Sequence, residues 1–430
     1  MLFSEADLCN SGYSIGQVPG HYLIQRLPMR IYVSGTTFIW AIIVFLHCAA
    51  FSYGGLIPLR FFLGVTESTM VPALEITMTM FFTPTELHQV QPIFWISCVG
   101  SVIPSGLLGY ALLWSKSTVS AWKFFMIVTG GVTLFLSVLT WFAYPNNPAT
   151  AWFLTTEEKV HVIRRVHEAT KSSIEQKTFK KHQFYEALRD PISWLFATGT
   201  FTLMLSNNLA FQQSLLFLDL GVTNLGSTLV WVASGGFAIV VAIIASLLLR
   251  QFPGYNAYWA TLWALPAVAG CIGMMALPWD KTISLLACIL LASNTWGMTY
   301  IISLGWTSST CAGHTKKLTR NGMFMAAYGV SNLISPQLWK SGAPRYYATW
   351  SVQLALSFIL TPALLILIRF ILSRRNTERR AWIEEQNSIG NYGEGYIERA
   401  DEKGQLVKVK VDVSVLDLTD LENKFFLYPL

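Results

Sequence analysis

The most informative segment of the chain covers residues 56–82 and reads LIPLRFFLGVTESTMVPALEITMTMFF. It is longer than the ~20 predominantly apolar residues that a helix needs to cross a bilayer. It nevertheless contains Arg60, Glu67 and Glu75. An ionisable side chain at the centre of a bilayer costs at least ~2.5–3.5 kcal/mol, so such side chains rarely face lipid. The segment therefore predicts a membrane-spanning helix whose charged side faces a helix bundle or a water-filled cavity.

The spacing of these charges places them on one side of the predicted helix. Arg60 and Glu67 are separated by nearly two turns and lie within ~20° of each other around the axis, while Glu75 lies ~80° further round. Two interpretations remain open. The charges form a structural cluster that holds this helix to its neighbours, or they form a path for a substrate or a proton. The second interpretation makes the chain a membrane carrier.

The composition of the 430 residues agrees with a membrane protein. Hydrophobic residues make up 53% of the chain and charged residues 13%, against ~25% charged residues in soluble domains, and the mean hydropathy is +0.45. These values exclude a soluble enzyme and a disordered chain. The net charge of +6 is concentrated in a few loops and in the C-terminal region, so nucleic-acid binding is not expected. The six cysteines form no CxxC pair, and neither a disulfide framework nor a metal site follows.

Apolar runs divide the chain into four parts. Residues 1–144 are predicted to form an N-terminal transmembrane half, 145–190 a cytoplasmic loop, 191–372 a C-terminal transmembrane half and 373–430 a cytoplasmic tail. Ten spans are predicted, four before the loop and six after it, and residues 12–27 form only a partial span. The ten spans cover residues 31–51, 56–82, 92–114, 122–144, 191–215, 226–249, 258–277, 283–306, 322–339 and 350–372.

The distribution of Lys and Arg sets the predicted orientation. Alternate loops collect Arg26, Arg30, the eight basic residues of the 145–190 loop and the basic start of the tail on one side of the membrane. The positive-inside rule places this side in the cytoplasm. Because carriers are often built from two matching halves, the count of four and six predicts that a first helix and part of a second are missing from the N-terminal end.

Two local patterns predict how individual helices are placed. Thr155 and Glu158 form a capping box at the start of an amphipathic helix that suits the membrane surface. A row of small residues at intervals of four lets a second helix approach closely, or leaves room for a ligand. The row consists of Ser97, Ser101, Ser105 and Gly109.

Several motifs in this order resemble one known family. RFFLGVTES occupies residues 60–68, PNNPATAWFLTTEE residues 145–158, AGHTKK residues 312–317 and DLTDLENKFFLYPL residues 417–430. AGHTKK is followed by Tyr328, Asn332, Pro336, Gln337 and by APRY at residues 343–346. From Tyr13 onward the chain resembles the major facilitator superfamily and, more narrowly, the fungal allantoate permease family of the anion:cation symporter group.

The resemblance implies an all-α membrane protein with the major facilitator fold, in which two six-helix halves rock against each other. The chain departs from the family pattern at three places. We expect the first helix and part of the second to be absent. The loop between the eighth and ninth helices has Arg250 but no acidic residue, and Asn146 stands where the family often has Asp. These loops therefore lack acidic residues on which the family builds its gating contacts.

The resemblance also implies import of a small organic anion with protons: a ureide such as allantoate, a nicotinate-like vitamin or a small peptide. Arg60 offers a planar, two-pronged donor for a carboxylate, and the carboxyl group of Glu67 could carry a proton. We therefore expect Arg60 to contact the anion and Glu67 to couple protons. A purely structural pair of Arg60 and Glu67 is the alternative.

Further candidates are polar or aromatic residues in or near the spans. Those that could bind the substrate, besides Arg60, are Asn207, Gln212, Asn294, Tyr300, Tyr328 and Asn332. Asn207 and Gln212 could equally lie at the outer rim, while Tyr328 and Asn332 are one turn apart and face the same way. Residues expected in the cytoplasmic loops, where they shape a gate or obey the positive-inside rule, are Arg26, Arg30, His314, Lys316 and Lys317.

No motif of an enzyme, a metal site or a cofactor site is visible. We expect a monomeric carrier in the plasma membrane whose partners are the transported anion, protons and the lipid bilayer, with no cofactor and no nucleic acid. One alternative is a truncated membrane protein that no longer transports or that acts as a sensor. Another is an exporter of a secondary metabolite, since the fold sets no direction. The sequence alone does not identify the substrate.

Overall fold

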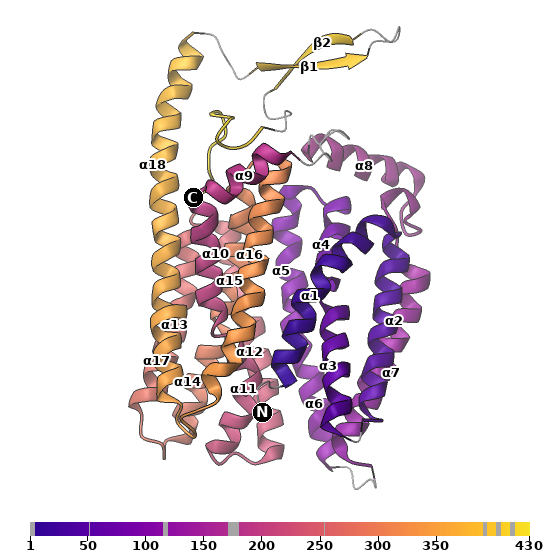
Figure 1. Cartoon of the computed structure of the whole chain (residues 1–430), viewed down its shortest axis with the longest axis vertical. Helices are drawn as coiled ribbons and strands as arrows, with labels where there is room; N and C mark the ends of the chain where they lie inside the picture. The colour runs from indigo at the N-terminus through magenta and orange to yellow at the C-terminus, as the bar shows by residue number, and fades with distance from the viewer. Residues whose placement is uncertain are drawn as a thin grey trace.

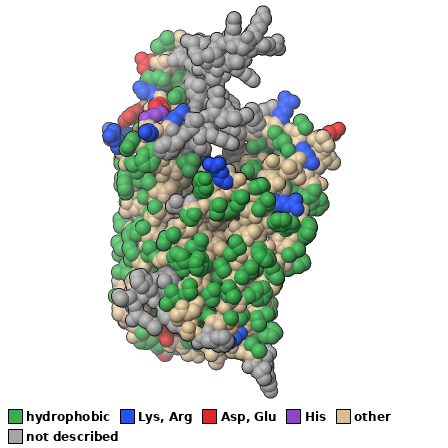
Figure 2. Space-filling model, turned by 45° about the vertical axis from the view of Figure 1, so that its right-hand side comes forward, with side chains coloured by type: hydrophobic (Ala, Val, Ile, Leu, Met, Phe, Trp, Pro, Cys, Tyr) green, Lys and Arg blue, Asp and Glu red, His purple; other side chains and the backbone are tan. Residues whose placement is uncertain are grey.

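The computed structural model describes residues 5–50, 52–114, 119–170, 180–252, 254–389, 394–400, 406–412 and 418–430. Within these residues the protein is almost entirely α-helical (Figure 1), and seven helical segments are long and apolar enough to cross a membrane. Hydrophobic side chains cover much of the face shown in Figure 2, and Lys and Arg side chains gather towards its upper end. The expectation of an all-α, multi-pass membrane protein is confirmed.

The helices before the central connection form one half of the molecule. Two of its crossings consist of two consecutive helices, α3 with α4 and α5 with α6. The helices of this half are α1 (Glu5–Arg26), α2 (Met29–His47), α3 (Tyr53–Glu67), α4 (Met70–Phe81), α5 (Pro84–Gly100), α6 (Val102–Trp114) and α7 (Ala121–Ala143).

Two short helices connect the halves at one end of the bundle (Figure 1), α8 (Thr156–Thr170) and α9 (Lys181–Arg189). The predicted capping box is confirmed at the start of α8. The Thr155 backbone N–H donates to Glu158 Oε2 at 2.8 Å, and the Glu158 N–H donates to Thr155 Oγ1 at 3.4 Å. Arg165 then fastens α8 to the first half, because its Nη1 lies 2.9 Å from Glu86 Oε1.

The second half follows the same plan of straight and interrupted crossings. Its helices are α10 (Pro191–Met204), α11 (Asn208–Asp219), α12 (Asn224–Gln251), α13 (Asn256–Ala276), α14 (Thr282–Asn294), α15 (Trp296–Ser309), α16 (His314–Ile334), α17 (Tyr347–Val352) and α18 (Thr361–Ser388). A 3₁₀ turn, Ser335–Trp339, follows α16, and a π-helical stretch, Gln353–Leu360, joins α17 to α18. The halves meet along two seams, because α12 packs along α5 and α6, and α1 packs along α16.

The last crossing extends beyond the predicted limit at residue 372. α18 continues to Ser388, because residues 373–388 contain no glycine or proline that would end the helix. After it, strands β1 (Glu394–Ala400) and β2 (Leu406–Asp412) form an antiparallel hairpin. The basic residues after residue 372 therefore mark the end of the membrane part of this helix and not the end of the helix itself.

The C-terminal segment, residues 418–430, returns to the second half and packs against it. Trp306 Nε1 donates to the Pro429 carbonyl at 2.8 Å, and the Asn256 N–H donates to the Leu430 carbonyl at 3.1 Å. The side-chain amide of Asn376 exchanges two hydrogen bonds with the backbone of Tyr428, at 2.8 and 2.9 Å. The end of the chain is thus a folded part of the second half.

The first helix, α1, differs from the predicted partial span. It has 22 residues and begins at Glu5, so the prediction of a short segment from residue 12 is wrong. Its polar first turns stay helical because α1 packs closely against α3. A Cβ atom at Gly16 would lie 2.8 Å from the Val65 Cα and carbonyl oxygen, and Cβ atoms at Gly12 and Gly20 would meet the Phe61 backbone and the Thr69 side chain. Glycines at intervals of four residues allow this approach.

Replacing Gly16 by Ala is expected to destabilise the protein by about 1–3 kcal/mol, the usual cost of overpacking. The matched control is Gly35→Ala, because Gly35 also lies inside a helix and a Cβ atom there meets no atom within 4 Å. The measurement is the thermal unfolding midpoint of the purified protein in detergent. Equal midpoints for the two variants would show that the close approach of α1 and α3 is not needed.

The predicted row of small residues on α5 and α6 is used only in part. A Cβ atom at Gly109 would lie 3.7 Å from the Thr228 methyl group of α12. The three serines are exposed and bond to their own helix: Ser97 donates to the Ile93 carbonyl at 3.0 Å and Ser105 to the Ser101 carbonyl at 2.8 Å. Close approach by α12 instead occurs at the neighbouring Gly106, where a Cβ would lie 2.8 Å from a methyl group of Val232.

Candidate functional site

Several membrane crossings are interrupted near their midpoints. α3 and α4 are separated by Ser68 and Thr69, α5 and α6 by Ser101, α10 and α11 by residues 205–207, and α14 and α15 meet at Thr295. The prediction of one continuous helix over residues 56–82 is therefore wrong. Pro72 has no N–H to donate to the carbonyl of residue 68, which favours the break. Interrupted helices expose backbone N–H and C=O groups and commonly form the ligand sites of transporters.

Glu67 is the last residue of α3 and lies directly at the first of these breaks. Its side chain is exposed and lies near Cys9 and Tyr13 of α1 and Tyr328 of α16. Arg60 is half-buried and also lies near Cys9. An exposed carboxylate and a guanidinium thus lie in one region, between α1, α3 and α16.

Asn207, Tyr328 and Asn332 form one polar group. Asn207 Nδ2 donates to Asn332 Oδ1 at 2.8 Å, and the Tyr328 side chain hydrogen-bonds both amides. Asn207 lies at the break between α10 and α11, while Tyr328 and Asn332 share one face of α16, as their spacing predicts. The electrostatic contact between Tyr328 and Glu67 connects this group to the first half.

Aromatic rings line the same region. The Tyr328 ring centroid lies 6.0 Å from that of Tyr13 and 5.7 Å from that of Tyr300, and Tyr300 lies 5.7 Å from Phe324. Tyr13 was not a sequence candidate, since it lies in the segment interpreted as a partial span. Its place among the glycines of α1, which face α3, is the signal that could have identified it.

Two other predicted residues lie apart from this group. Asn294 Nδ2 donates to Ser234 Oγ and to the Leu290 carbonyl, both at 2.9 Å, so this amide joins α14 to α12. Gln212 is half-buried on α11. Its neighbour Gln213 is buried, and Gln213 Oε1 accepts no hydrogen bond within the described part of the chain.

The residues expected at a gate or in the loops have separate environments. The Arg26 guanidinium lies 5.4 Å from the Tyr22 ring centre. The Arg30 N–H donates to Asn146 Oδ1 at 3.0 Å, which ties the start of α2 to the segment after α7. Lys317 is exposed. The side chains of Glu75 and His314 lie outside the described part of the structure.

The prediction that Lys316 lies in a loop is wrong. Lys316 lies in the first turn of α16, where its side chain is completely buried. Its Nζ lies 2.7 Å from Glu186 Oε1, 2.7 Å from Asp420 Oδ1 and 3.6 Å from Asp190 Oδ2. Burial of an ammonium group requires such partners. Lys316 therefore joins α16 to α9 and to the C-terminal segment.

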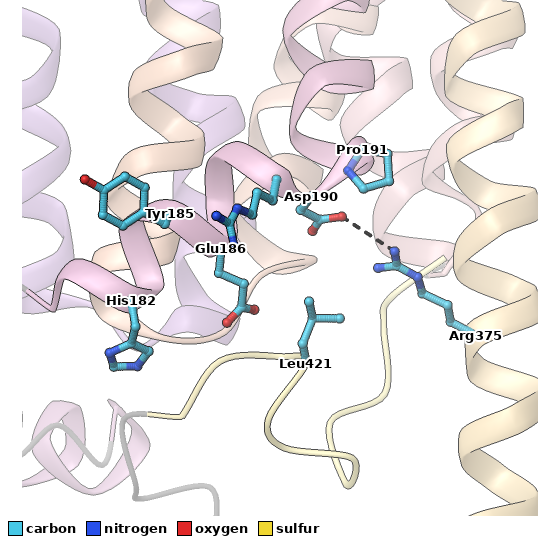
Figure 3. A pocket seen from close by; sticks show the side chains of 8 residues that line it. His182, Tyr185, Glu186, Asp190, Pro191, Arg375 and Leu421 are labelled. Atoms are coloured by element: carbon cyan, nitrogen blue, oxygen red, sulfur yellow. Dashed lines mark ion pairs between the residues drawn. The ribbon is translucent and has the colours of Figure 1, made fainter.

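Arg320, one turn further along α16, completes this buried charge cluster. Its Nη2 lies 2.6 Å from Asp190 Oδ2, and its Nη1 donates to the Thr310 carbonyl at 2.9 Å. Arg375 of α18 approaches Asp190 Oδ1 at 3.5 Å (Figure 3). Sequence reasoning did not single out Asp190, whose position immediately before the apolar run of α10 was the available signal.

Within the described ranges, no group of three His, Cys, Asp or Glu side chains could hold a metal ion. The six cysteines are free thiols. The arrangement can bind and orient a polar solute and a proton, and it contains no set of groups for covalent chemistry.

A comparison with known protein families identifies the superfamily of this chain. Residues 8–336 match the family model described as Major Facilitator Superfamily. The chain belongs to the major facilitator superfamily. It is therefore a secondary transporter and not an enzyme, and the expectation drawn from its motifs is confirmed at the level of the superfamily.

Curated relatives from this superfamily match nearly the whole chain. An uncharacterized transporter of Schizosaccharomyces pombe is 51% identical over 97% of this chain and 74% of its own length. A high affinity cysteine transporter of Saccharomyces cerevisiae is 45% identical over 97% of this chain and 80% of its own length. A thiamine pathway transporter of the same yeast is 28% identical over 95% of this chain and 74% of its own length.

Solved structures of the superfamily share the fold. A D-xylose-proton symporter superposes with a TM-score of 0.61 at 12% identity, over 84% of this chain and 88% of the other. A bacterial homologue of the human lysosomal transporter Spinster gives a TM-score of 0.54 at 13% identity, over 85% and 88% of the two chains. At this identity the likeness shows the major facilitator fold and nothing about the substrate.

The Asp420 carboxyl makes the buried charge cluster dependent on pH. Burial alone would raise its pKa, but the Lys316 ammonium and Arg320 outweigh burial and hold the pKa below the usual value of 3.8. A carboxyl whose folded pKa is lowered stabilises the protein above its unfolded pKa, and this stabilisation is lost as the pH falls through the folded value.

We therefore expect Asp420→Asn to be less stable than the natural protein by about 3–5 kcal/mol at neutral pH, since it leaves a buried cation uncompensated. The difference between the two proteins should stay constant down to pH ~4 and shrink below it. The measurement is the unfolding free energy of both proteins across this range. A difference that grows on acidification would contradict the pairing of Asp420 with Lys316.

Proposed function

We propose that this transporter imports a small carboxylate-bearing solute together with protons, and that an amino acid of the size of cysteine is the first candidate. The 45% identical relative named as a high affinity cysteine transporter supports this choice. The ureides, nicotinate-like vitamins and small peptides implied by the allantoate permease resemblance share the carboxylate and are the alternative substrates. We place the protein in the plasma membrane, with the central connection and the C-terminal segment in the cytoplasm.

The observation that carries the proposal is the position of Arg60 and Glu67. Two opposite charges lie within one membrane crossing, both are near Cys9, and one of them lies at a helix break. Placing charges at membrane depth is costly, which favours a role in transport over a random surface position. Arg60 matches the shape of a carboxylate with two parallel N–H donors.

The polar group on the second half suits the other end of an amino acid. The carbonyl oxygen of Asn332 accepts one hydrogen bond from Asn207, and the Tyr328 side chain hydrogen-bonds both amides. The phenol oxygen of Tyr328 could accept an N–H group of a substrate ammonium. A solute held between Arg60 on one half and Tyr328 on the other would contact both halves, as alternating access requires.

Glu67 is the proposed proton carrier because it is the acidic group at this break that water can reach. Protonation would remove the negative charge of Glu67 before the two halves close around it and exclude water. In such a low-dielectric environment a neutral carboxyl costs far less than a carboxylate. Release of the proton on the cytoplasmic side, where the pH is higher, would then give the cycle its direction.

The test is uptake of radiolabelled cysteine by proteoliposomes that contain the purified protein, in the presence of a reductant. An inward proton gradient of one pH unit corresponds to about 1.4 kcal/mol and supports about tenfold accumulation for one proton per substrate. We expect accumulation that a protonophore abolishes and that unlabelled cysteine inhibits better than allantoate or nicotinate. Accumulation that does not respond to the proton gradient would contradict the proposal. Stronger inhibition by another carboxylate would replace cysteine as the substrate.

A further inference from the structure

A cavity of about 450 Å³ opens beside the buried charge cluster (Figure 3). It is bounded by α9, the start of α10, α18 and the C-terminal segment, and its lining includes His182, Tyr185, Arg189 and Arg375. Its size falls within the range of about 300–1,000 Å³ that small-molecule sites occupy. It is far in sequence from Arg60 and Glu67, and the proposed transport cycle makes no use of it.

The negative charges in the wall of this cavity are already engaged. Glu186 binds Lys316 at 2.7 Å and accepts a hydrogen bond from Thr419 Oγ1 at 3.0 Å. Asp190 is buried and lies 2.6 Å from Arg320. Both carboxylates are already paired with cations of the protein. The side chains of the wall that can bind a charged ligand are therefore the basic ones.

The arginine side chains of the wall are only partly supplied with acceptors, since Arg375 pairs with Asp190 and interacts with Tyr428. Arg189 is exposed and has no ion pair or hydrogen bond from its side chain within the described residues. Arg375 lies 3.5 Å from Asp190, and its buried Nη1 finds no hydrogen-bond acceptor in the same part of the chain. A buried N–H group without an acceptor costs about 1–3 kcal/mol. These arginines therefore favour a ligand with several negatively charged oxygen atoms.

The cavity lies at the level expected for lipid headgroups. Tyr185 lines it and is exposed, and Trp194, just inside α10, is also exposed while its indole N–H donates to the Leu188 carbonyl at 2.8 Å. Exposed Trp and Tyr side chains concentrate at the membrane–water interface. The basic loops place this end of the molecule on the cytoplasmic side, where the anionic lipids of the inner leaflet are found.

We propose that this cavity binds a phosphate monoester, with the headgroup of an inner-leaflet phosphoinositide as its source. Arg189 would present paired N–H donors to phosphate oxygens, and Arg375 would add its Nη1 group, since its Nη2 is engaged by Asp190. Basic cavities at the cytoplasmic ends of membrane helices bind such headgroups in other proteins. The ligand would bridge α9 and α18 and so hold the connection between the halves against the last crossing.

The experiment measures binding to the purified full-length protein in detergent by isothermal titration calorimetry. The probes are dioctanoyl phosphatidylinositol 4-phosphate, its soluble headgroup inositol 1,4-bisphosphate, and dioctanoyl phosphatidylcholine as the zwitterionic control. We expect the phosphoinositide to bind and phosphatidylcholine not to bind. Tighter binding of the lipid than of its headgroup assigns the site to the membrane, whereas equal binding assigns it to a soluble phosphate monoester.

The variants are Arg189→Gln and, as a matched control, Arg374→Gln. Arg374 is adjacent to Arg375 but is not among the residues that line the cavity, is highly exposed and lies 3.5 Å from Glu378. Arg189→Gln should weaken binding about tenfold, the effect of losing one hydrogen bond to a charged group, and Arg374→Gln should leave it unchanged. If neither phosphate probe binds, or if Arg189→Gln binds like the natural protein, the proposal is wrong.

Discussion

Replacing Glu67 by Gln is expected to abolish accumulation driven by a proton gradient. Gln has nearly the same shape as a protonated Glu but can neither bind nor release a proton. The variant should therefore still exchange labelled for unlabelled substrate across the membrane, while the substrate concentration inside settles at its equilibrium value. The measurements are accumulation and counterflow in the same proteoliposomes, with and without the inward proton gradient.

The matched control for this prediction is Glu86→Gln. Glu86 lies at the start of α5, accepts a hydrogen bond from the Thr83 N–H at 2.9 Å and pairs with Arg165, so its charge serves the helix end and α8. Accumulation by Glu86→Gln should respond to the proton gradient as it does in the natural protein. If Glu67→Gln also accumulates substrate like the natural protein, Glu67 is not the proton carrier and the structural interpretation of its charge is favoured.

Asp190→Asn is expected to cost about 3–5 kcal/mol of folding stability, because removing one partner of a buried ion pair leaves the other charge uncompensated. The Asp190 side chain is fully buried. Its carboxylate oxygens lie 2.6 Å from Arg320 Nη2, 3.6 Å from Lys316 Nζ and 3.5 Å from Arg375 Nη2. It also accepts a hydrogen bond from the Ile192 N–H at the start of α10. The measurement is the thermal unfolding midpoint in detergent.

Two comparisons make this prediction specific. Glu378→Gln removes the partner of Arg374 in an exposed pair and should cost at most about 0.5 kcal/mol. The double variant of Asp190→Asn with Arg320→Met should lose less than the sum of the single losses, because the second change removes the cation that the first leaves unpaired. Additive losses, or an Asp190→Asn midpoint equal to that of Glu378→Gln, would show that the buried charge cluster does not stabilise the fold.

Properties that depend on local sequence were predicted well. The length and hydrophobicity of the apolar runs identified the membrane class, and the capping box of Thr155 and Glu158 formed as expected. The common face of Tyr328 and Asn332 follows from helical geometry alone. Each of these inferences uses residues that are close in sequence, where the helix repeat fixes the relation between side chains.

Properties that depend on contacts between distant segments were not predicted. Lys316 looked like a loop residue under the positive-inside rule, because its partners Glu186 and Asp420 lie over 100 residues away in the chain. The 418–430 segment looked like a polar tail, although its Tyr428 packs into the core of the second half. Hydropathy reports how a residue partitions into lipid, and it contains no information about an ion pair that is formed only in the folded protein.

The break after Glu67 was missed for a related reason. The apolar character of residues 56–82 continues across Ser68 and Thr69, and Pro72 alone predicts a kink as readily as a break. The structure buries both hydroxyl residues, and Thr69 Oγ1 hydrogen-bonds the Tyr32 hydroxyl of α2. The neighbouring helix thus supplies the contact that makes an interrupted crossing stable at this point.

The most direct test of the proposed mechanism is proton entry driven by substrate. Proteoliposomes with a pH-sensitive dye inside and equal pH on both sides receive external cysteine, and the internal pH is recorded. The account predicts internal acidification that starts with cysteine addition, is absent in Glu67→Gln and persists in Glu86→Gln. Entry of cysteine through the natural protein without any change of internal pH would contradict proton coupling.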